Sequence, residues 1–439
     1  MLRYYCELAA RSLWRTPVLS SLMVLAIAVG VGASMTSLAV LRLLSGDPLP
    51  GRSQHLYYVQ LDPRPLGKNQ GNGEPPMSMT YTDAMNLLRA HRADRQAVMY
   101  DSVAPIVPPD PDLASFYAHT WVTTADFFPM FSVAFRYGGP WRTADDQSRA
   151  RVAVISTKLN NKLFHGENSV GQILQIGDHR LRVIGVIGNW RPAPLFYVAP
   201  AMAAGQSNNN YGSVEDVFLP LLTARELQLL PNGIDCESAN PDLSHLETTE
   251  CGWLLLWVEL DSAAKAADYR KLLVNYSQEQ KSVGRFQRPP NVRLRDVNRL
   301  LSDLHVVPND VRLQTWIAFG FLLVCIVNTV GLLLAKFLRR AYDVGVRRAF
   351  GATRGAIFVQ YLLEALAVGI VGGGFGLALT AAGLWWMRHR PRDYASLIHL
   401  DPGTVGLTIL VAIAASLLAG LLPAWRACRI PPALQLKEN

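Results

Sequence analysis

Four long runs of apolar residues limit what this chain can fold into. A helix of about 20 largely apolar residues crosses the roughly 30 Å of hydrocarbon in a bilayer, and such runs occupy residues 17–42, 313–336, 356–387 and 403–425. The first run is longer than the apolar core of a cleaved signal peptide, which has about 7–15 residues, so we expect it to be retained. The sequence therefore predicts a membrane protein with four transmembrane α-helices.

The positions of arginine and lysine predict the orientation of these spans. Basic residues are concentrated in residues 1–16, 337–355 and 426–439, which lie on one side of the membrane if there are four crossings. Because basic residues favour the cytoplasmic side, we expect both termini in the cytoplasm and residues 43–312 on the outer side of the membrane. The short loop 388–402 carries three arginines that oppose the rule locally. The formal net charge of +8 thus reflects helix ends, not a nucleic-acid partner.

The segment between the first and second spans has the composition of a globular domain. Strand-like and helix-like runs are interleaved without a strict βαβ alternation, which favours an α+β fold. We expect two lobes, one next to the flanking spans and one formed by an insertion of about residues 105–250. The expected strands are 55–61, 116–122, 152–155, 181–186 and 254–260, and the expected helices are 81–92, 125–131, 156–164 and 263–274. Thr80 or Thr82 is expected to cap the first of these helices.

Cysteine positions agree with this topology. Cys236 and Cys251 both lie in the segment expected outside the cytoplasm, within a polar stretch. An oxidising compartment favours a disulfide between them, which would close a loop of about 15 residues and contribute about 3 kcal/mol. Cys6, Cys325 and Cys428 are expected to stay reduced.

Motifs for catalysis are missing from the sequence. The histidines have no metal-ligand spacing, no G-x-S-x-G motif is present, and the adjacent acids Asp145 and Asp146 suit a solvated loop. There is also no G-x-x-x-x-G-K-[ST] motif, so we expect neither ATP hydrolysis nor a metal or cofactor in this chain.

Several segments together resemble the MacB/FtsX family of ABC permeases. The matching segments are RSLWRTPVLSSLMVLAIAVGVGA at the N-terminus, residues 151–189 in the expected periplasmic domain, residues 336–376, and LLPAWRACRIPPALQL near the C-terminus. Asp343 and Val344 stand where the family commonly has Glu-Ile, and Gln435 stands where a basic residue is usual. The resemblance implies a protein of the bacterial inner membrane, with a MacB-like periplasmic core domain at residues 43–312 and without a fused ATPase domain.

The resemblance also implies partners. A separate cytoplasmic ABC ATPase would bind ATP and magnesium, and each complex would contain two ATPases and a second permease chain, identical or paralogous. The basic segment before the third span would be the coupling helix that docks on the ATPase, with Val344, Val346, Ala349 and Phe350 on one apolar face; the alternative is a plain cytoplasmic loop. The residues assigned to coupling are Asp343, Val344, Gly345, Val346, Arg347, Arg348, Ala349, Phe350, Gly351 and Ala352. Residues 1–16 are expected to form an amphipathic helix on the membrane surface.

Small residues at four-residue spacing predict close helix packing in lipid. They are Ala26, Gly30 and Ser34 in the first span and Gly369, Gly372, Gly373 and Gly376 in the third. These contacts lie within the chain or across a dimer. Glu364 is an acid well inside the third span, which makes it a functional candidate, although a structural role near the cytoplasmic edge is equally consistent with its position.

The spans show no line of polar residues that could form a hydrophilic tunnel. We therefore expect mechanotransmission, in which ATP-driven movement below the membrane rearranges the periplasmic domain. The expected outcome is efflux of antibiotics, peptides or other periplasmic substrates, with a membrane-fusion adaptor and an outer-membrane channel as further partners. The alternatives are a lipoprotein-releasing permease and an FtsX-like signalling protein that regulates a cell-wall hydrolase.

Overall fold

The computed structural model of the chain contains two compact units. Residues 1–45 and 307–439 form a helical unit, and residues 46–306 form an α+β unit. The residues described are 16–66, 73–203, 211–236, 241–307, 309–339, 344, 346–348, 350–389, 397 and 402–429. The predicted N-terminal amphipathic helix lies almost wholly outside these residues.

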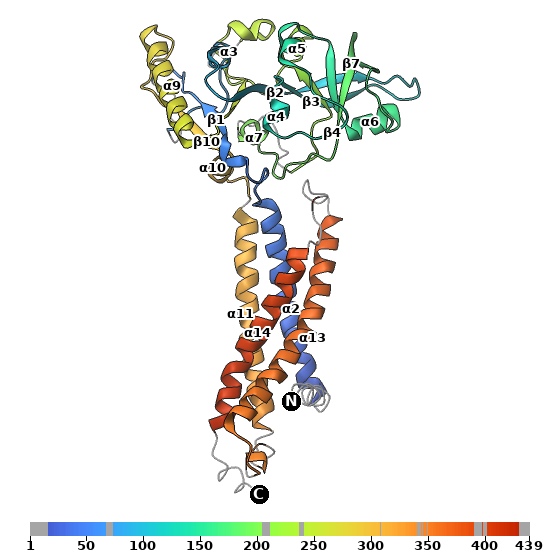
Figure 1. The fold of residues 1–439 in the computed structure, drawn as a ribbon, viewed down its shortest axis with the longest axis vertical. Coiled ribbons are helices and arrows are strands. Elements are labelled where there is room, and N and C mark those ends of the chain that lie inside the picture. The colour runs from blue at the N-terminus through green and yellow to red at the C-terminus, as the bar shows by residue number, and fades with distance from the viewer. Residues whose placement is uncertain are drawn as a thin grey trace. The chain divides into compact units, whose positions relative to one another are not determined.

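The helical unit consists of four long helices that run side by side (Figure 1). They are α2 (Pro17–Leu44), α11 (Asn309–Leu338), α13 (Arg354–Arg388) and α14 (Pro402–Arg429). Each is long and apolar enough to span a membrane, with a mean hydropathy of 1.9 to 2.5 over its most apolar window. The four predicted spans are therefore confirmed, with ends that differ from the predicted ones by up to four residues.

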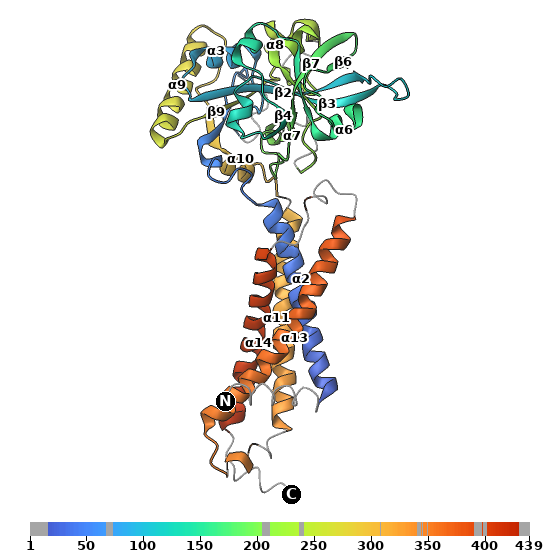
Figure 2. The same ribbon diagram turned by 45° about the vertical axis from the view of Figure 1, so that its right-hand side comes forward.

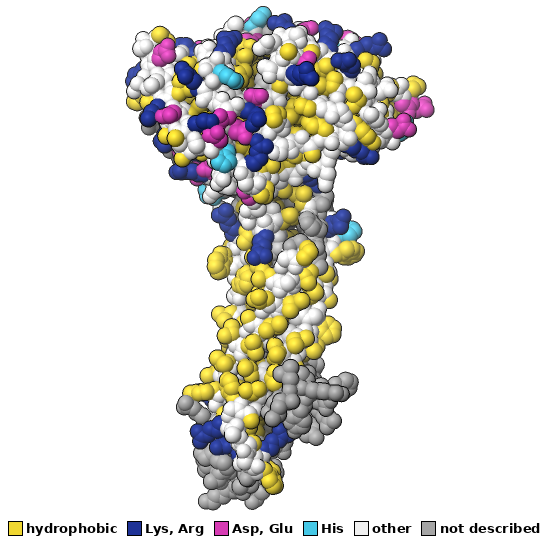
Figure 3. Space-filling model, viewed as in Figure 1, with side chains coloured by type: hydrophobic (Ala, Val, Ile, Leu, Met, Phe, Trp, Pro, Cys, Tyr) yellow, Lys and Arg dark blue, Asp and Glu magenta, His cyan; other side chains and the backbone are white. Residues whose placement is uncertain are grey.

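Apolar side chains cover the outside of this helical unit. The space-filling view shows mostly hydrophobic side chains along the helices (Figure 3), and residues such as Leu25, Val324, Ile370 and Leu418 are exposed. No water-soluble protein would leave so much apolar surface uncovered. This surface suits contact with lipid.

Glycines let α13 approach two neighbouring helices closely. A Cβ at Gly372 or Gly376 would lie 3.0 to 3.3 Å from Ile27 or Val31 of α2. A Cβ at Gly373 would lie 2.8 Å from the Cβ of Ala412 on α14. A Cβ at Gly369 would lie 2.0 Å from the Oγ of Ser416 on the same helix. The predicted glycine pairs of the third span thus make contacts within the chain, one pair to each neighbour.

Two of the three small residues predicted to form a packing stripe on α2 make close contacts with α11. Gly30 packs against Cys325 of α11, where an added Cβ would lie 3.0 Å from the cysteine Cβ. The Ser34 hydroxyl donates to the backbone oxygens of Gly30 and of Ala318 on α11, both at 2.8 Å. Ala26 is only half-buried.

The α+β unit is built on one ten-stranded sheet. Its strand order is β10-β1-β9-β2-β3-β8-β5-β7-β4, with β6 paired to β2 and β7. The strands are β1 (Leu56–Gln60), β2 (Arg95–Val107), β3 (Phe116–Thr123), β4 (Phe135–Gly138), β5 (Val152–Ser156), β6 (Ile173–Ile176), β7 (His179–Ile187), β8 (Val217–Pro220), β9 (Leu255–Glu259) and β10 (Arg293–Asp296). Pairing is antiparallel except between β3 and β8 and between β5 and β7.

Helices cover both faces of this sheet, as Figures 1 and 2 show. One core involves α3, α6, α8 and α9, and the other involves α4, α7 and α10. Side chains alternate between the two cores, so that Val59 faces one and Tyr58 faces the other. The helices are α3 (Tyr81–Ala90), α4 (Phe127–Met130), α5 (Thr143–Gln147), α6 (Thr157–Phe164), α7 (Ala199–Ala203), α8 (Leu221–Glu226), α9 (Ala263–Ser282) and α10 (Val297–Asp303), with short 3₁₀ turns η1 (Ser53–His55) and η2 (Leu243–Thr248).

The predicted insertion of about residues 105–250 shares one sheet with its flanking segments. Residues 105–250 supply β3 to β8, whereas the flanking segments supply β1, β9 and β10. The two parts are halves of one sheet, because β2 pairs with β9 over Arg95–Met99 and with β3 over Met99–Ile106. Backbone hydrogen bonds therefore continue across the expected boundary.

Two local predictions agree with the structure. The Thr80 hydroxyl caps α3 by accepting from the backbone N–H of Asp83. Cys236 and Cys251 form a disulfide with a sequence separation of 15. Cys325 and Cys428 are free and buried.

Candidate functional site

The connection between α11 and α13 carries the residues predicted to contact an ATPase. Val344 and residues 346–348 are helical, and Gly351 has a φ of +92°, which glycine tolerates without steric cost. The Thr353 hydroxyl then caps α13 by accepting from the N–H of Ala356 at 3.2 Å. The chain thus passes from a short helix through one sharp turn directly into α13. Asp343, Gly345 and Ala349 lie outside the described residues.

The apolar residues of this connection do not share one face. Val344 is buried, and it belongs to a core of the helical unit that includes Phe337 and Ile357. Ala352 packs against the same core, whereas Phe350 is 89% exposed. The predicted apolar face is therefore divided, with Val344 anchoring the connection to the helices and Phe350 left at the surface.

Three arginines lie within four residues of Phe350 in the sequence. Arg347 and Arg354 are exposed, Arg348 is half-buried, and Arg347 donates to the Gln360 side chain at 3.0 Å. A bulky apolar side chain among guanidinium groups suits a protein surface with an apolar pocket and an acidic rim.

A buried ion pair links α11 to α13. Lys336 Nζ lies against Glu364 Oε1, and the two side chains are 0% and 2% exposed. Lys336 also donates to the Ser20 hydroxyl of α2 at 3.3 Å, so the cluster joins three helices. Within the described part of the helical unit, Lys336 and Glu364 are the only buried charged side chains. Charges inside a bilayer are costly unless they are paired.

An aromatic contact lies one residue away from this pair. Phe337 of α11 and Tyr361 of α13 stack with ring centroids 3.9 Å apart and an interplanar angle of 27°. Tyr361 and Glu364 are three positions apart, so they share one face of α13. The ion pair and the stacked rings therefore connect α11 and α13, the two helices on either side of the connection that carries Phe350.

The sequence singled out Glu364 but missed its partner. Lys336 is the last residue of the predicted second span, where a lysine suits the membrane edge, whereas the structure buries it among the helices. A usable signal was present, because Lys336 ends one span and Glu364 lies about two turns into the next. Two antiparallel helices place such positions at similar depth, so opposite charges there can pair.

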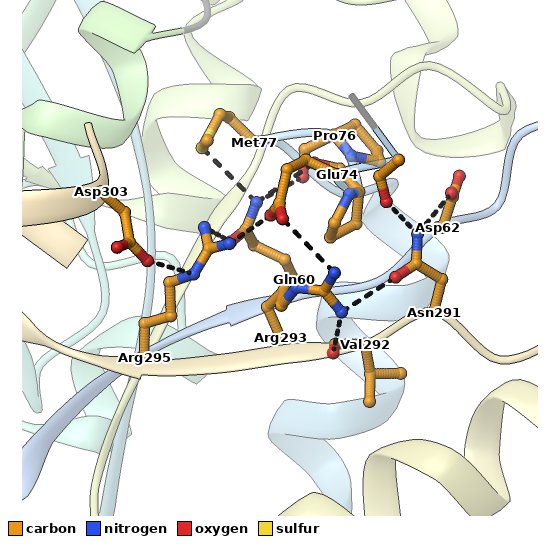
Figure 4. A network of polar contacts seen from close by, with 12 residues as sticks. Gln60, Asp62, Glu74, Pro76, Met77, Asn291, Val292, Arg293, Arg295 and Asp303 are labelled. Atoms are coloured by element: carbon orange, nitrogen blue, oxygen red, sulfur yellow. Dashed lines mark hydrogen bonds and ion pairs between the residues drawn. The ribbon is translucent and has the colours of Figure 1, made fainter. Parts of the chain in front are cut away.

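A second polar cluster lies at one edge of the α+β unit. Arg295 of β10 is buried and contacts Gln60, Glu74 and Asp303 (Figure 4). Burial opposes ionisation of Glu74, but Arg295 and Arg293 outweigh it, so the pKa of Glu74 lies below its usual value. The cluster therefore fixes β10, β1 and α10 to one another through charged hydrogen bonds.

The elements that this cluster joins lie next in sequence to two of the spans, α2 and α11. β1 begins 12 residues after the end of α2, and α10 ends six residues before the start of α11. The elements joined by Arg295 are thus the first strand after one span, and the last strand and helix before the next. The sequence reasoning did not identify this cluster, since charged residues on an edge strand look like ordinary surface residues.

A buried carboxyl in the α+β unit should make its stability depend on pH. Glu215 is 8% exposed and accepts a hydrogen bond from the Tyr197 hydroxyl at 2.7 Å. Burial, with smaller contributions from Asp101 and Asp216, raises the pKa of Glu215 to about 8 despite that hydrogen bond. The folded protein thus holds a proton that the unfolded chain releases near pH 4.3, the approximate pKa of a free glutamate.

We predict that Glu215→Gln reduces the pH dependence of unfolding between about pH 4.3 and 8. A raised folded-state pKa stabilises the fold fully below the unfolded pKa, and this contribution is lost as the pH rises towards about 8. Urea unfolding of the full chain, followed by tryptophan fluorescence at pH 5 and pH 8, measures the difference. The exposed Glu167→Gln should retain the wild-type pH dependence. An unchanged pH dependence in Glu215→Gln would contradict the assignment.

Comparisons with known proteins match both units. Residues 20–276 match the family model of the MacB-like periplasmic core domain, and residues 316–432 match that of the FtsX-like permease C-terminal domain. The first match alone covers more than half of the chain. The chain therefore belongs to the MacB/FtsX-like family of ABC permeases, and its α+β unit is the periplasmic domain of that family.

Relatives with assigned names include two exporters. The macrolide export ATP-binding/permease protein MacB of Salmonella paratyphi A is 23% identical over 271 residues, covering 58% of this chain and 34% of that protein. The pyoverdine export ATP-binding/permease protein PvdT of Pseudomonas entomophila is 24% identical over 331 residues, covering 73% of this chain and 42% of that protein. The chain thus spans well under two thirds of the length of these relatives.

A solved structure also resembles this chain. The periplasmic region of MacB from Actinobacillus actinomycetemcomitans is 11% identical, with a TM-score of 0.36 over 58% of this chain and 97% of that one.

Proposed function

We propose that this chain is the membrane subunit of an ABC-type complex that couples a separate cytoplasmic ATPase to movement of the periplasmic domain. The observation that carries the proposal is Phe350, an 89% exposed aromatic side chain on a basic turn that leads directly into α13. Its exposure leaves an apolar group for a partner, and large aromatic side chains are common anchors at protein interfaces.

The packing around this turn gives a route for force. Val344 and Ala352 pack on either side of the turn against the same helical core, so a partner that moves Phe350 also displaces that core. Because α13 begins directly after Ala352 and its cap Thr353, the displacement acts on the start of a long helix. Close-packed interiors transmit such displacement instead of absorbing it.

The buried ion pair would keep the connected helices together during this movement. Lys336 and Glu364 join α11 to α13, and Ser20 adds α2. In the periplasmic domain, the Arg295 cluster binds together the strands and helix nearest in sequence to α2 and α11. Charged contacts that hold elements together within each unit suit a protein that transmits mechanical work.

Transport between these helices is not part of the proposal. Buried hydroxyls such as those of Thr329 and Thr380 donate to backbone oxygens four residues earlier in their own helices. In the described part of the helical unit the buried charges are one ion pair, which offers no polar path. We propose efflux of a periplasmic substrate pushed by the periplasmic domain, as the names of two export relatives suggest.

The remaining parts of the complex follow from this scheme. Both termini and the Phe350 turn would face the cytoplasm, in agreement with the positive charges beside the spans. The complex would contain a second permease chain and a pair of ATPases that bind ATP and magnesium. A membrane-fusion adaptor and an outer-membrane channel would complete the path for an exported substrate.

Co-purification with the ATPase tests the proposal. The ABC ATPase from the same gene neighbourhood should co-purify with the full chain, and Phe350→Ala should weaken the association by about 30-fold, the equivalent of a 2 kcal/mol interface anchor. The matched control is Phe375→Ala, which removes a 60% exposed phenylalanine from the lipid-facing part of α13. If the wild-type chain retains no ATPase, or Phe350→Ala retains as much as Phe375→Ala, the proposal is wrong.

A further inference from the structure

A cavity of about 190 Å³ lies within the periplasmic domain, apart from the features used above for coupling. The rings of Pro63, Pro65 and Pro76 supply apolar lining. Proline rings are rigid and carry no N–H group, so they present C–H surface without a donor of their own.

The disulfide holds another part of the wall. Asp235 and Gly252 line the cavity and form a backbone bridge, in which each N–H donates to the other's carbonyl oxygen at 2.8 Å. The Cys236–Cys251 disulfide links the adjacent residues of the same two segments. This wall is therefore fixed covalently as well as by hydrogen bonds.

Two arginines line the cavity, but buried acids already pair with them. Arg64 makes two hydrogen bonds to Asp62, whose side chain is 1% exposed, and Asp62 also lies 3.5 Å from Arg288. Arg285 lies 2.9 Å from Asp83, whose side chain is likewise 1% exposed. These positive charges are therefore largely used within the protein.

Two further carboxylates give the cavity an excess of negative charge. Asp235 makes no ion pair within the described part of the chain, and Glu250 approaches only Arg285, at 3.5 Å. Because Asp62 and Asp83 hold the two lining arginines, Asp235 has no positive partner of its own and Glu250 only shares Arg285 with Asp83. Both Asp235 and Glu250 are exposed to the surface, so an entering ligand can reach them.

A buried hydroxyl in the lining lacks a hydrogen-bond partner. Ser78 lines the cavity and is 3% exposed, and its Oγ makes no hydrogen bond to any described residue. It lies beside Gly252, where an added Cβ would approach it to 2.9 Å. An unpartnered buried hydroxyl is destabilising, and a ligand that donates a hydrogen bond to it would offset this cost.

We propose that this cavity binds a small primary amine in its ammonium form. The ammonium group supplies the positive charge that Asp235 and Glu250 lack, and one of its three N–H groups can donate to Ser78. The alkyl part packs on the proline rings. The proposal goes beyond ATPase coupling and does not depend on it, because a failure to bind amines would leave the co-purification result unchanged.

Binding of n-butylamine to the full chain in lipid nanodiscs tests the proposal by saturation-transfer NMR. Butyrate and n-butanol have the same alkyl chain with a negative or neutral head and should not show saturable binding. The double variant Asp235→Asn/Glu250→Gln should lose at least tenfold in affinity. The matched control, Asp110→Asn/Asp112→Asn in the loop between β2 and β3, should bind as the wild type does.

A second variant separates binding from folding. Ser78→Ala removes the unpartnered hydroxyl, so it should weaken amine binding severalfold without lowering the melting temperature. The proposal is overturned if n-butylamine shows no saturable binding up to about 10 mM, if butyrate binds equally, or if the Asp235/Glu250 double variant binds like the wild type.

Discussion

Lys336→Met is expected to lower the free energy of unfolding of the helical unit by about 3–5 kcal/mol, because it leaves Glu364 as an uncompensated carboxylate inside the bundle. Titration with sodium dodecyl sulfate in mixed micelles, followed by tryptophan fluorescence, measures this loss. The control Arg388→Met removes an exposed charge at the end of α13 and should change the stability by no more than about 0.5 kcal/mol.

The double variant Lys336→Met/Glu364→Met should recover most of this stability. Replacing both members of a buried ion pair by apolar residues of similar volume is often neutral or stabilising. The double variant therefore separates folding from coupling. If the pair transmits force, this variant should fold and retain the ATPase, yet lose stimulation of ATP hydrolysis by the periplasmic substrate. A Lys336→Met protein as stable as the wild type would contradict the burial of the pair.

Gly369→Ala is expected to push α13 and α14 apart. A Cβ at this position would lie 2.0 Å from the Ser416 Oγ and 2.6 Å from its Cβ. Carbon atoms pack at about 3.5–4.0 Å, and a Cβ cannot move away without its helix. Overpacking of this kind costs about 1–3 kcal/mol, so the same detergent titration should show a loss of that size.

Gly374→Ala provides the matched control for this substitution. It adds the same methyl group to the same helix, at a position where no atom lies within 4 Å. Because alanine favours helix more than glycine by up to about 1 kcal/mol, Gly374→Ala should be neutral or slightly stabilising. Equal losses in the two variants would show that helix contact at Gly369 is not the cause.

The membrane part of the fold is strongly encoded in the sequence. Each span must present about 20 apolar residues to lipid, so Pro17–Leu44 and the later spans stand out by composition alone. The sequence does not show which neighbouring helix each small residue contacts. The spacing of Gly369, Gly372, Gly373 and Gly376 predicts close packing, but only the structure shows that one pair contacts α2 and the other contacts α14.

The periplasmic domain was harder to predict for a physical reason. β2 is the longest strand, yet it was missed because both its faces are buried over residues 96–102, which removes the alternation that marks a half-exposed strand. Pro105 lies within this strand, and proline is uncommon inside strands. The Lys336–Glu364 pair was missed for a different reason, since pairing between helices depends on depth and rotation that no single span contains.

The continuous sheet affects how a small displacement of one edge is transmitted to the opposite edge. From β10 to β4, every strand that the structure describes is hydrogen-bonded to the next, so separating two neighbouring strands would break backbone hydrogen bonds. A stiff body of this kind behaves as a lever, and a slight rotation of the edge held by Arg295 would swing the opposite edge through a longer arc. The amplitude of movement available to a transported molecule would then be set by the width of the sheet.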